Sequence, residues 1–271
     1  MSQSRRPGKR AYLMITLFAL LLVLFPFLFW YGTWFGRPLS DSDLDKYFAD
    51  TAHPRHAQHA LVQIGERMSH NRDVSRWYPA IVRAGESPSA ELRQTAAWIM
   101  GQDRNYAPFH VALARMVRDP ETMVRRNAAL GLAAFGDPAA RPELVAMLRP
   151  YTVQSPVAGA VKYRLKLGDY VNPGTLVAHV GTVEVRAAAP GEVRSLARNE
   201  GATVQSADAL AELAPDKGHA WEALRALYLI GEPADLEDIE RFTHVSPTVS
   251  ETLAKQATEA AEAIHARAAR Q

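Results

Sequence analysis

Apolar and uncharged residues run from Ala11 to Gly36, the longest stretch of the chain without a charged residue. About 20 apolar residues are enough for a helix to cross the hydrocarbon core of a membrane. One proline, here Pro26, is tolerated inside such a helix. The pattern predicts a single transmembrane helix over residues 11–36. The residues expected to anchor it, as interfacial aromatic side chains do, are Tyr12, Trp30, Tyr31 and Trp34.

The residues before this run predict its orientation. Four bases and no acid precede it, namely Arg5, Arg6, Lys9 and Arg10. The positive-inside rule then places a basic tail, residues 1–10, in the cytoplasm. A cleavable signal peptide is the alternative, but the bulky stretch Phe27–Tyr31 lacks the small residues of a cleavage site. The expected localisation is a bacterial-type inner membrane, single-pass, with the bulk of the chain periplasmic or otherwise extracytoplasmic.

Residues 37–149 have the apolar spacing of helices, and Pro, Gly and Asp separate the segments. Ser40 is expected to cap the first of these helices, because acidic residues follow it. Two stretches resemble each other 32 residues apart: LRQTAAWIMG, Leu92–Gly101, and VRRNAALGLA, Val124–Ala133. A repeat of this length predicts stacked helical hairpins, the architecture of an α-solenoid.

The stretch VRRNAALGLAAFGDPAARPELVAML, Val124–Leu148, resembles a HEAT repeat. An arginine after the first apolar residue and a Gly-Asp-Pro before the second helix are typical of that family; Arg125 and Gly136–Pro138 supply them. The resemblance is good over residues 119–149, fair over 88–118 and loose over 53–86. It implies HEAT-like repeats over residues 37–149 and a binding surface without chemistry.

Helical spacing returns in the C-terminal segment, residues 216–271. The stretch His219–Pro233 aligns with Val124–Pro138, which places Gly231 on Gly136. A long Ala-rich helix is expected from about Pro247 to Ala269. These residues are therefore predicted to continue the solenoid as a further repeat and a long helix, after an insertion.

The inserted segment, residues 150–215, is rich in β-branched residues, Gly and Pro, as short strands and turns require. Its two halves resemble each other, so that Gly159 corresponds to Gly191 and Val161 to Val193. This doublet predicts a small pseudo-symmetric β-sandwich. The glycines expected at its turns are Gly159, Gly168, Gly174, Gly181, Gly191 and Gly201.

The insertion resembles the biotinyl/lipoyl domain fold. The residues that carry the resemblance are Pro156–Val161, Gly168–Asp169, Val171 and Pro173–Gly174. Carrier members of that family display a modified lysine on a hairpin between the two halves. Here Gly181–Thr182 stands at that hairpin as a two-residue, Gly-first turn, and no lysine lies between Lys166 and Lys217. The resemblance therefore implies the fold without covalent biotin or lipoate, and no cofactor is predicted.

Composition narrows the possible functions. The chain has no cysteine, which excludes disulfides, thiolate metal sites and a cysteine nucleophile. The formal net charge is +2, and without the four N-terminal bases the rest is near neutral, so nucleic-acid binding is not expected. No G-x-S-x-G, H-E-x-x-H or phosphate-binding loop occurs. We therefore expect no catalytic activity and no small-molecule substrate.

The stretch HPRHAQH is a weak candidate for metal binding. Its histidines, His53, His56 and His59, are three residues apart, so two imidazoles can share one helix face. Asp50 is the nearby carboxylate that could join them. A polar helix face without a metal is the simpler interpretation, and no metal site is predicted.

Other conspicuous side chains have simple structural interpretations. Asp41, Asp43 and Asp45 alternate, but the Gly and Glu of a calcium loop are missing. His179 is a lone histidine, expected to be exposed or hydrogen-bonded. Arginines that recur in the repeats are expected in inter-repeat salt bridges or at the surface: Arg93, Arg125 and Arg126. Aromatic residues expected in the solenoid core are Trp77, Tyr78, Trp98 and Trp221.

Together these patterns predict an α + β multidomain protein with a transmembrane helix and a HEAT-like solenoid interrupted by an all-β domain. The expected function is a non-catalytic, membrane-anchored scaffold or accessory subunit that binds and stabilises protein partners in a larger inner-membrane complex. That complex could be respiratory, photosynthetic, or one for transport or assembly. One alternative is a periplasmic adaptor-like component of a transport or secretion system. The other is a metal-binding protein that uses His53, His56 and His59.

Overall fold

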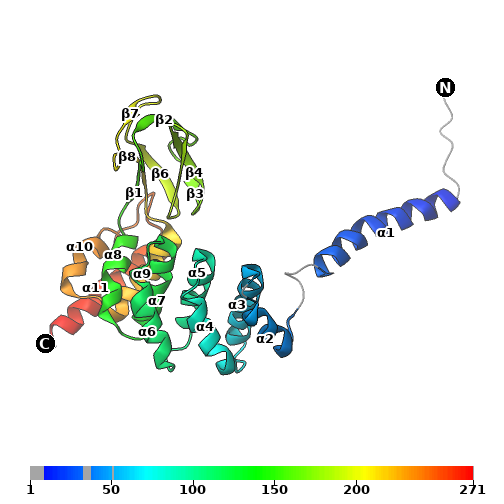
Figure 1. Ribbon diagram of the computed structural model, residues 1–271. Coiled ribbons are helices and arrows are strands. Elements are labelled where there is room, and N and C mark those ends of the chain that lie inside the picture. Colours follow the sequence, from blue (N-terminus) through cyan, green and yellow to red (C-terminus); the bar gives the residue numbers. More distant parts are fainter. Residues whose placement is uncertain (1–8, 33–37, 51, 271) are drawn as a thin grey trace. The chain divides into compact units, whose positions relative to one another are not determined.

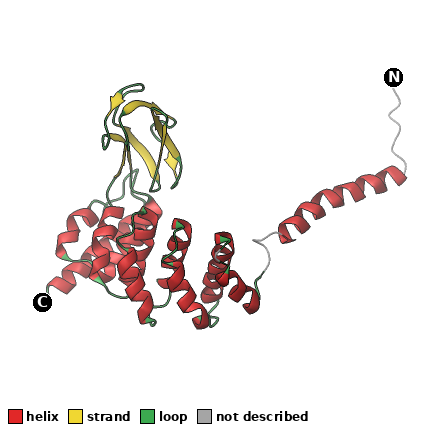
Figure 2. Cartoon of the chain, in the orientation of Figure 1, coloured by secondary structure: helices red, strands yellow, loops and turns green. Residues whose placement is uncertain are grey.

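A computed structural model describes residues 9–32, 38–50 and 52–270, which form α-helices and two four-stranded sheets (Figures 1 and 2). A helical region is followed by a strand-rich domain, and further helices follow the strands. The chain divides into two compact units, Met1–Arg72 and Asp73–Gln271. Each unit is described by itself below.

The first unit contains α1 (Lys9–Gly32), α2 (Asp41–Ala49) and α3 (Pro54–Ser69). Ser40 caps α2: its Oγ accepts a hydrogen bond from the Asp43 amide, and the Asp43 carboxylate accepts one from the Ser40 amide. This reciprocal pair is a capping box, which satisfies two otherwise orphaned amides. Helices α2 and α3 pack together, with Leu44 and Ile64 fully buried.

The prediction of a membrane span is wrong. Among the residues that the structure describes, no helix is both long enough and apolar enough to cross a membrane. The transmembrane helix over residues 11–36 and the single-pass inner-membrane localisation are therefore not supported. Of the expected anchors, Pro26 lies inside α1.

The other expected anchors fall outside the described side chains. Tyr12, Trp30 and Tyr31 lie within the bounds of α1, but their side chains are outside the description. Trp34 lies outside the described residues altogether.

The second unit begins with helical hairpins. Helix α5 (Ala90–Met100) packs against α7 (Thr122–Ala134), and α7 packs in turn against α9 (Lys217–Ile230). Helices α6 (Ala107–Met116) and α8 (Arg141–Met147) pack beside α7. The start of α7 follows that of α5 by the 32 residues of the repeat seen in the sequence. The helices before the strands, with η for a 3₁₀ helix, are η1 (Ser75–Trp77), α4 (Tyr78–Ala84), α5 (Ala90–Met100), α6 (Ala107–Met116), α7 (Thr122–Ala134), η2 (Pro138–Ala140) and α8 (Arg141–Met147).

The repeat is also visible in hydrogen bonds. Nη1 of Arg93 donates to the carbonyls of Ser87 and Pro88, which lie six and five residues earlier. Nη1 of Arg125 donates to the carbonyls at the same two offsets, Asp119 and Pro120. Each arginine therefore closes the loop that precedes its own helix, which explains why arginine occurs at this position in both repeats.

Eight strands follow α8 and form two sheets, with the strand orders β1-β8-β6-β3 and β5-β4-β2-β7. Buried side chains from both sheets form one hydrophobic core, which includes Val153, Val161, Val185 and Leu213. The domain is therefore a small β-sandwich. Its strands are β1 (Tyr151–Gln154), β2 (Gly159–Tyr163), β3 (Tyr170–Val171), β4 (Leu176–Val180), β5 (Val183–Arg186), β6 (Gly191–Leu196), β7 (Thr203–Val204) and β8 (Ala209–Leu213).

The two sheets are related by the doublet in the sequence. Exchanging β1–β4 with β5–β8 turns one strand order into the other. The hydrogen bonds repeat as well: the Gly201 amide donates to the Val161 carbonyl at 2.8 Å, and the Gly168 amide donates to the Val193 carbonyl at 2.9 Å. The two halves of the domain thus fold alike, and each completes the other's sheet.

The hairpin between the halves is tight. Val180 at the end of β4 pairs with Val183 at the start of β5, so Gly181 and Thr182 alone form the turn. Gly181 has a φ of +58°, a value that glycine adopts at no steric cost. Gly159 and Gly191 differ from the prediction, because they are the first residues of β2 and β6 and do not lie in turns.

Ala207 is strained where the first half of the domain has a glycine. Its φ is +69°, and that of the corresponding Gly174 is +85°. Both amides donate at 2.7 Å to equivalent carbonyls, those of Ser155 and Ala187. We expect Ala207→Gly to raise the free energy of unfolding by about 0.5–1 kcal/mol, because a left-handed φ costs a non-glycine residue about 1–2 kcal/mol and the added chain entropy offsets part of the gain.

Urea denaturation of both variants tests this expectation. The reverse change, Gly174→Ala, serves as the matched control and should lower the stability by about 1 kcal/mol. An Ala207→Gly variant with a lower midpoint than the wild type would show that the Ala207 methyl group contributes more than its strain costs.

Helices resume after the strands and pack on those before them, with α9 in contact with both α7 and α8. Two bidentate ion pairs join the two helical segments: Arg141 binds Asp235, and Arg149 binds Asp238. Ser250 caps the last helix, which starts four residues after the predicted Pro247. The helices are α9 (Lys217–Ile230), η3 (Pro233–Asp235), α10 (Leu236–Glu240) and α11 (Glu251–Ala268).

Candidate protein-binding groove

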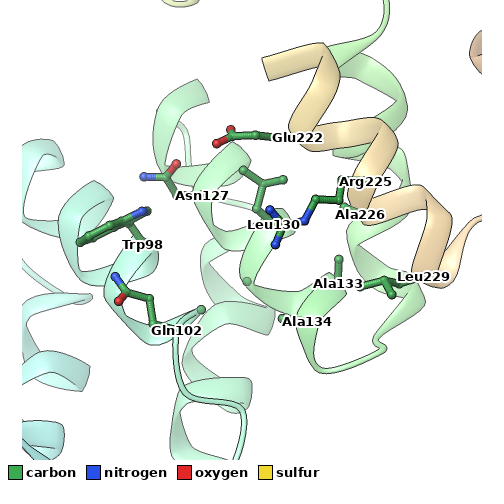
Figure 3. Close-up of a pocket in the computed structure, with 12 residues that line it drawn as sticks. Trp98, Gln102, Asn127, Leu130, Ala133, Ala134, Glu222, Arg225, Ala226 and Leu229 are labelled. Carbon is green, nitrogen blue, oxygen red and sulfur yellow. The ribbon is translucent and has the colours of Figure 1, made fainter. Parts of the chain in front are cut away.

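A groove of about 250 Å³ lies on α5, α7 and α9 (Figure 3). Trp98 of α5 stands on one side of it, and Glu222, Arg225 and Leu229 of α9 stand on the other. The remaining lining residues are Gly101, Gln102, Asn127, Leu130, Gly131, Ala133, Ala134 and Ala226. Because the lining comes from three helices that are separate in the sequence, the groove exists only when α5 and α9 are packed on α7.

Small residues form the floor of the groove. A Cβ atom at Gly101 would lie only 2.8 Å from Cα of Gly131, which shows how closely α5 and α7 approach. Ala133 and Ala134 add only methyl groups. Since no large side chain fills this space, a side chain from another molecule can enter it.

The sides of the groove expose apolar surface. The exposed fraction of Trp98 is 51%, and that of Leu229 is 54%. The expectation that Trp98 lies in the core is therefore wrong, whereas Trp77 is buried as expected. Large aromatic side chains that remain exposed beside a hollow are typical of binding surfaces.

Glu222 gives the groove a chemical preference. Desolvation by its surroundings raises the pKa of Glu222 above its usual value; Arg225 opposes this rise, and Asp216 adds to it. Arg225 also lies over the Trp221 ring, with 5.6 Å between the guanidinium carbon and the ring centroid. A further cation near Glu222 would stabilise its charged form.

Several groove residues occupy equivalent positions of the helical repeats, although the sequence alone does not show that these positions line a groove. In the repeat alignment, Trp98, Leu130 and Arg225 occupy one equivalent position of α5, α7 and α9. Gln102, which follows the C-terminal cap of α5, is equivalent to Ala134 of α7 and Leu229 of α9. Both sets line the groove, so one helix face of each repeat builds the surface. The exposure of that face becomes known only when the helices are stacked.

A polar network, of which Arg126 is the buried member, lies where the strands meet the helices. Arg126, only 6% exposed, lies 3.1 Å from Nδ1 of His219 through its Nη1. Asp216 caps α9 through the His219 amide and accepts a hydrogen bond from the Tyr170 hydroxyl of β3 at 2.7 Å. Burial lowers the pKa of Arg126, while Glu143, Asp216 and Tyr151 oppose the shift. The network links strand β3 to the start of α9.

The histidine-rich stretch is divided by the structure. Asp50, His53 and His56 offer ligand atoms that all lie within 4.8 Å of one another, whereas His59 is outside this group and buried in α3. The carboxylate expected from sequence thus joins the first two histidines. The three residues are the group among the described residues whose donors suit a metal ion.

The remaining candidates have structural roles. Asp43 belongs to the capping box of α2, and Asp41 pairs with Arg67. His179 lies in β4, 3.9 Å from the carboxylate of Glu184 on the neighbouring strand. Tyr78 donates to Asp103 at 2.5 Å. Among the glycines predicted at turns, a positive φ occurs at Gly168, Gly174, Gly181 and Gly201.

The family comparison covers the helices that build most of the groove. Residues 78–158 match the family model of HEAT repeats. The match begins at α4, runs past α8 and includes the whole first strand. No curated protein matches the chain in sequence. Residues 78–158 are thus similar to HEAT repeats, which suggests that the protein is a scaffold for protein–protein interactions.

Proposed function

We propose that the protein is a non-catalytic scaffold that binds a segment of a partner protein in the groove on α5, α7 and α9. The observation that carries the proposal is the exposed Trp98 beside a floor of small residues. The similarity to HEAT repeats supports it, because stacked helical repeats present extended binding surfaces.

The chemistry of the groove favours one kind of segment. Trp98 and Leu229 suit a bulky apolar side chain that would sit on the Gly101–Gly131 floor. Glu222, whose pKa is raised by desolvation, suits a lysine or arginine next to that apolar residue. The proposed ligand is therefore a partner segment with an apolar residue flanked by a basic one.

The β-sandwich is proposed to be a biotinyl/lipoyl-like domain that serves as architecture. The exchange symmetry of its strands supports this assignment. The two-residue turn at Gly181–Thr182 leaves no room to present a modified lysine, so the domain would not carry biotin or lipoate. Ion pairs such as Arg149–Asp238 hold together the helices on either side of it.

Site-specific photocrosslinking in the native cell tests the groove directly. A photoreactive residue is placed at Gln102, on the groove, and separately at the exposed Arg118, outside the groove lining. We expect a discrete crosslinked partner from position 102 and none from position 118. The crosslinked peptide should contain an apolar residue next to a lysine or arginine.

Titration with the purified partner then measures the contribution of each residue. Trp98→Ala should weaken binding at least about 10-fold, as for a central aromatic residue of an interface, and Glu222→Lys should weaken it as well. The matched controls, Val111→Ala and Glu262→Lys, change exposed residues outside the groove and should leave the affinity within about two-fold. Equal crosslinking from positions 102 and 118, or unchanged affinity of Trp98→Ala, would contradict the proposal.

A further inference from the structure

The turn between α2 and α3 brings three metal-ligand side chains together. Asp50 is the C-terminal cap of α2, His53 is the N-terminal cap of α3, and His56 lies in the first turn of α3. Nδ1 of His53 lies 2.9 Å from Oδ2 of Asp50, and Nδ1 of His56 lies 2.5 Å from the same oxygen. Both imidazoles therefore present the same type of nitrogen to one carboxylate oxygen.

Neighbouring groups hold two of these side chains in place. Oδ1 of Asp50 accepts hydrogen bonds from the amides of Ala52 and His53 at 3.1 and 3.2 Å, which turns Oδ2 toward the imidazoles. The Tyr47 ring stacks on the His56 ring, with centroids 4.5 Å apart and planes 9° from parallel. Such supporting contacts orient ligands and are characteristic of metal sites.

We propose that Asp50, His53 and His56 bind a divalent transition-metal ion of the Zn²⁺ class through two imidazole nitrogens and one carboxylate oxygen. This donor set suits Zn²⁺, Co²⁺ or Ni²⁺ and disfavours Ca²⁺ and Mg²⁺, which require mostly oxygen ligands. Three protein ligands leave a fourth position for water or for a group from another molecule.

The spacing of the ligand atoms is compatible with an ion after a small movement. Ligands about 2.1 Å from a tetrahedral ion lie about 3.4 Å apart, while the two nitrogens now lie 2.9 and 2.5 Å from Oδ2. Each must therefore move away from Oδ2 by less than about 1 Å. The side chain of His53 is 68% exposed and makes no capping bond to α3, so it can move.

The pocket beside the cluster gives an ion access. His53 and His56 also line a groove of about 880 Å³, together with residues of α3 as far as Val62. His59 lies on the same groove but its ring is outside the cluster. The geometry thus selects Asp50 as the third ligand in place of His59.

Calorimetric titration of the full chain, without a histidine tag, with ZnCl₂ tests the site. We expect one ion per chain, and Co²⁺ should give the visible absorption bands of a four-coordinate nitrogen–oxygen site. Asp50→Asn removes the charged ligand but keeps an oxygen that can accept from the Ala52 and His53 amides. This variant and the exposed-site variant His53→Ala should each weaken Zn²⁺ binding at least about 10-fold.

A histidine outside the cluster provides the control. His70 is exposed at the C-terminal end of the same helix, where its Nδ1 contacts the Glu66 carbonyl. The His70→Ala variant should bind Zn²⁺ like the wild type. The proposal is overturned if the wild type binds no ion, if Asp50→Asn and His53→Ala both bind normally, or if His70→Ala weakens binding equally. Circular dichroism of each variant establishes that it is folded.

Discussion

Replacing Asp119 with alanine is expected to lower the free energy of unfolding by about 3 kcal/mol, the lower end of the range for breaking a buried ion pair. Both carboxylate oxygens of Asp119 bind Arg93, at 2.7 and 2.9 Å. The two side chains are 9% and 15% exposed, so the arginine left behind would lose its charge partner in a poorly hydrated place. Oδ1 also accepts a hydrogen bond from the Glu121 amide, just before α7.

A second ion pair in the same repeats provides a control of similar length. Nη2 of Arg115 lies 2.8 Å from Oε1 of Glu86, but these side chains are 61% and 58% exposed. Glu86→Ala should therefore change the stability by less than about 1 kcal/mol, as for other exposed pairs. Urea denaturation of the two variants at pH 7 measures the difference. Equal losses would show that burial does not determine the contribution of Asp119.

Acid provides an independent check on the same carboxylate. Burial would raise the pKa of Asp119, but hydrogen bonds from Arg93 and the Glu121 amide outweigh it and hold the pKa below its usual value of 3.8. A depressed folded-state pKa stabilises the protein above the unfolded-state pKa, and this contribution is lost as the pH falls through the folded-state value. The stability gap between wild type and Asp119→Asn should therefore narrow below about pH 4.

The repeat architecture follows from the sequence because it depends on local signals. A 32-residue period, a recurring arginine and a Gly-Asp-Pro before the second helix predict the HEAT-like hairpins, which the family match over residues 78–158 confirms. The doublet of the inserted segment likewise corresponds to the two strand sets that exchange between the sheets. In both cases the residues that determine the structure of a repeat lie within that repeat. An example is Arg125, which hydrogen-bonds the loop before its own helix.

Features that depend on how the helices pack against one another could not be predicted from the sequence. Trp98 has the helical position of a core residue, yet α5, α7 and α9 leave it at the side of a groove, so the prediction that it is buried was wrong. The sequence named Asp50 as a nearby carboxylate, but the three-residue spacing of His53, His56 and His59 did not show whether Asp50 or His59 lies beside the first two histidines. That choice depends on the α2–α3 turn, which places Asp50 beside the first two histidines.

The apolar run near the N-terminus shows a different limit. Hydropathy alone predicted a membrane span over residues 11–36, and the described helices contain no segment that meets the requirements for one. By contrast, the enrichment of residues 150–215 in β-branched residues, Gly and Pro correctly indicated a strand-rich domain after the helices. A pattern that repeats along the chain thus constrained the fold more strongly than a single run of apolar residues.

Replacing Gly191 with alanine is expected to destabilise the protein by about 3 kcal/mol, the upper end of the usual range for overpacking. A Cβ atom at this position would overlap the carbonyl oxygen of Ala214 and lie 3.1 Å from Cβ of Leu213. The Ala214 amide donates to the Glu192 carbonyl at 2.8 Å, so this segment is held against β6 and cannot move away freely. The φ of Gly191 is not in the left-handed region, so the cost comes from space alone.

Gly159, the corresponding glycine of the other half of the domain, provides the control. It distinguishes the steric effect at Gly191 from any general cost of alanine at the start of a strand. Around Gly159, the nearest atoms to an added Cβ are the amide nitrogen of Gly181 at 3.1 Å and Cγ1 of Val180 at 3.2 Å. Gly159→Ala should therefore cost only about 1 kcal/mol. Urea denaturation compares the two variants directly. Equal losses of stability would contradict the steric argument, because they would mean that both halves tolerate a methyl group alike. We expect the larger loss at Gly191. The reason is that the chain leaves β8 beside Gly191 to start α9, and the first half of the domain has no such connection to a helix.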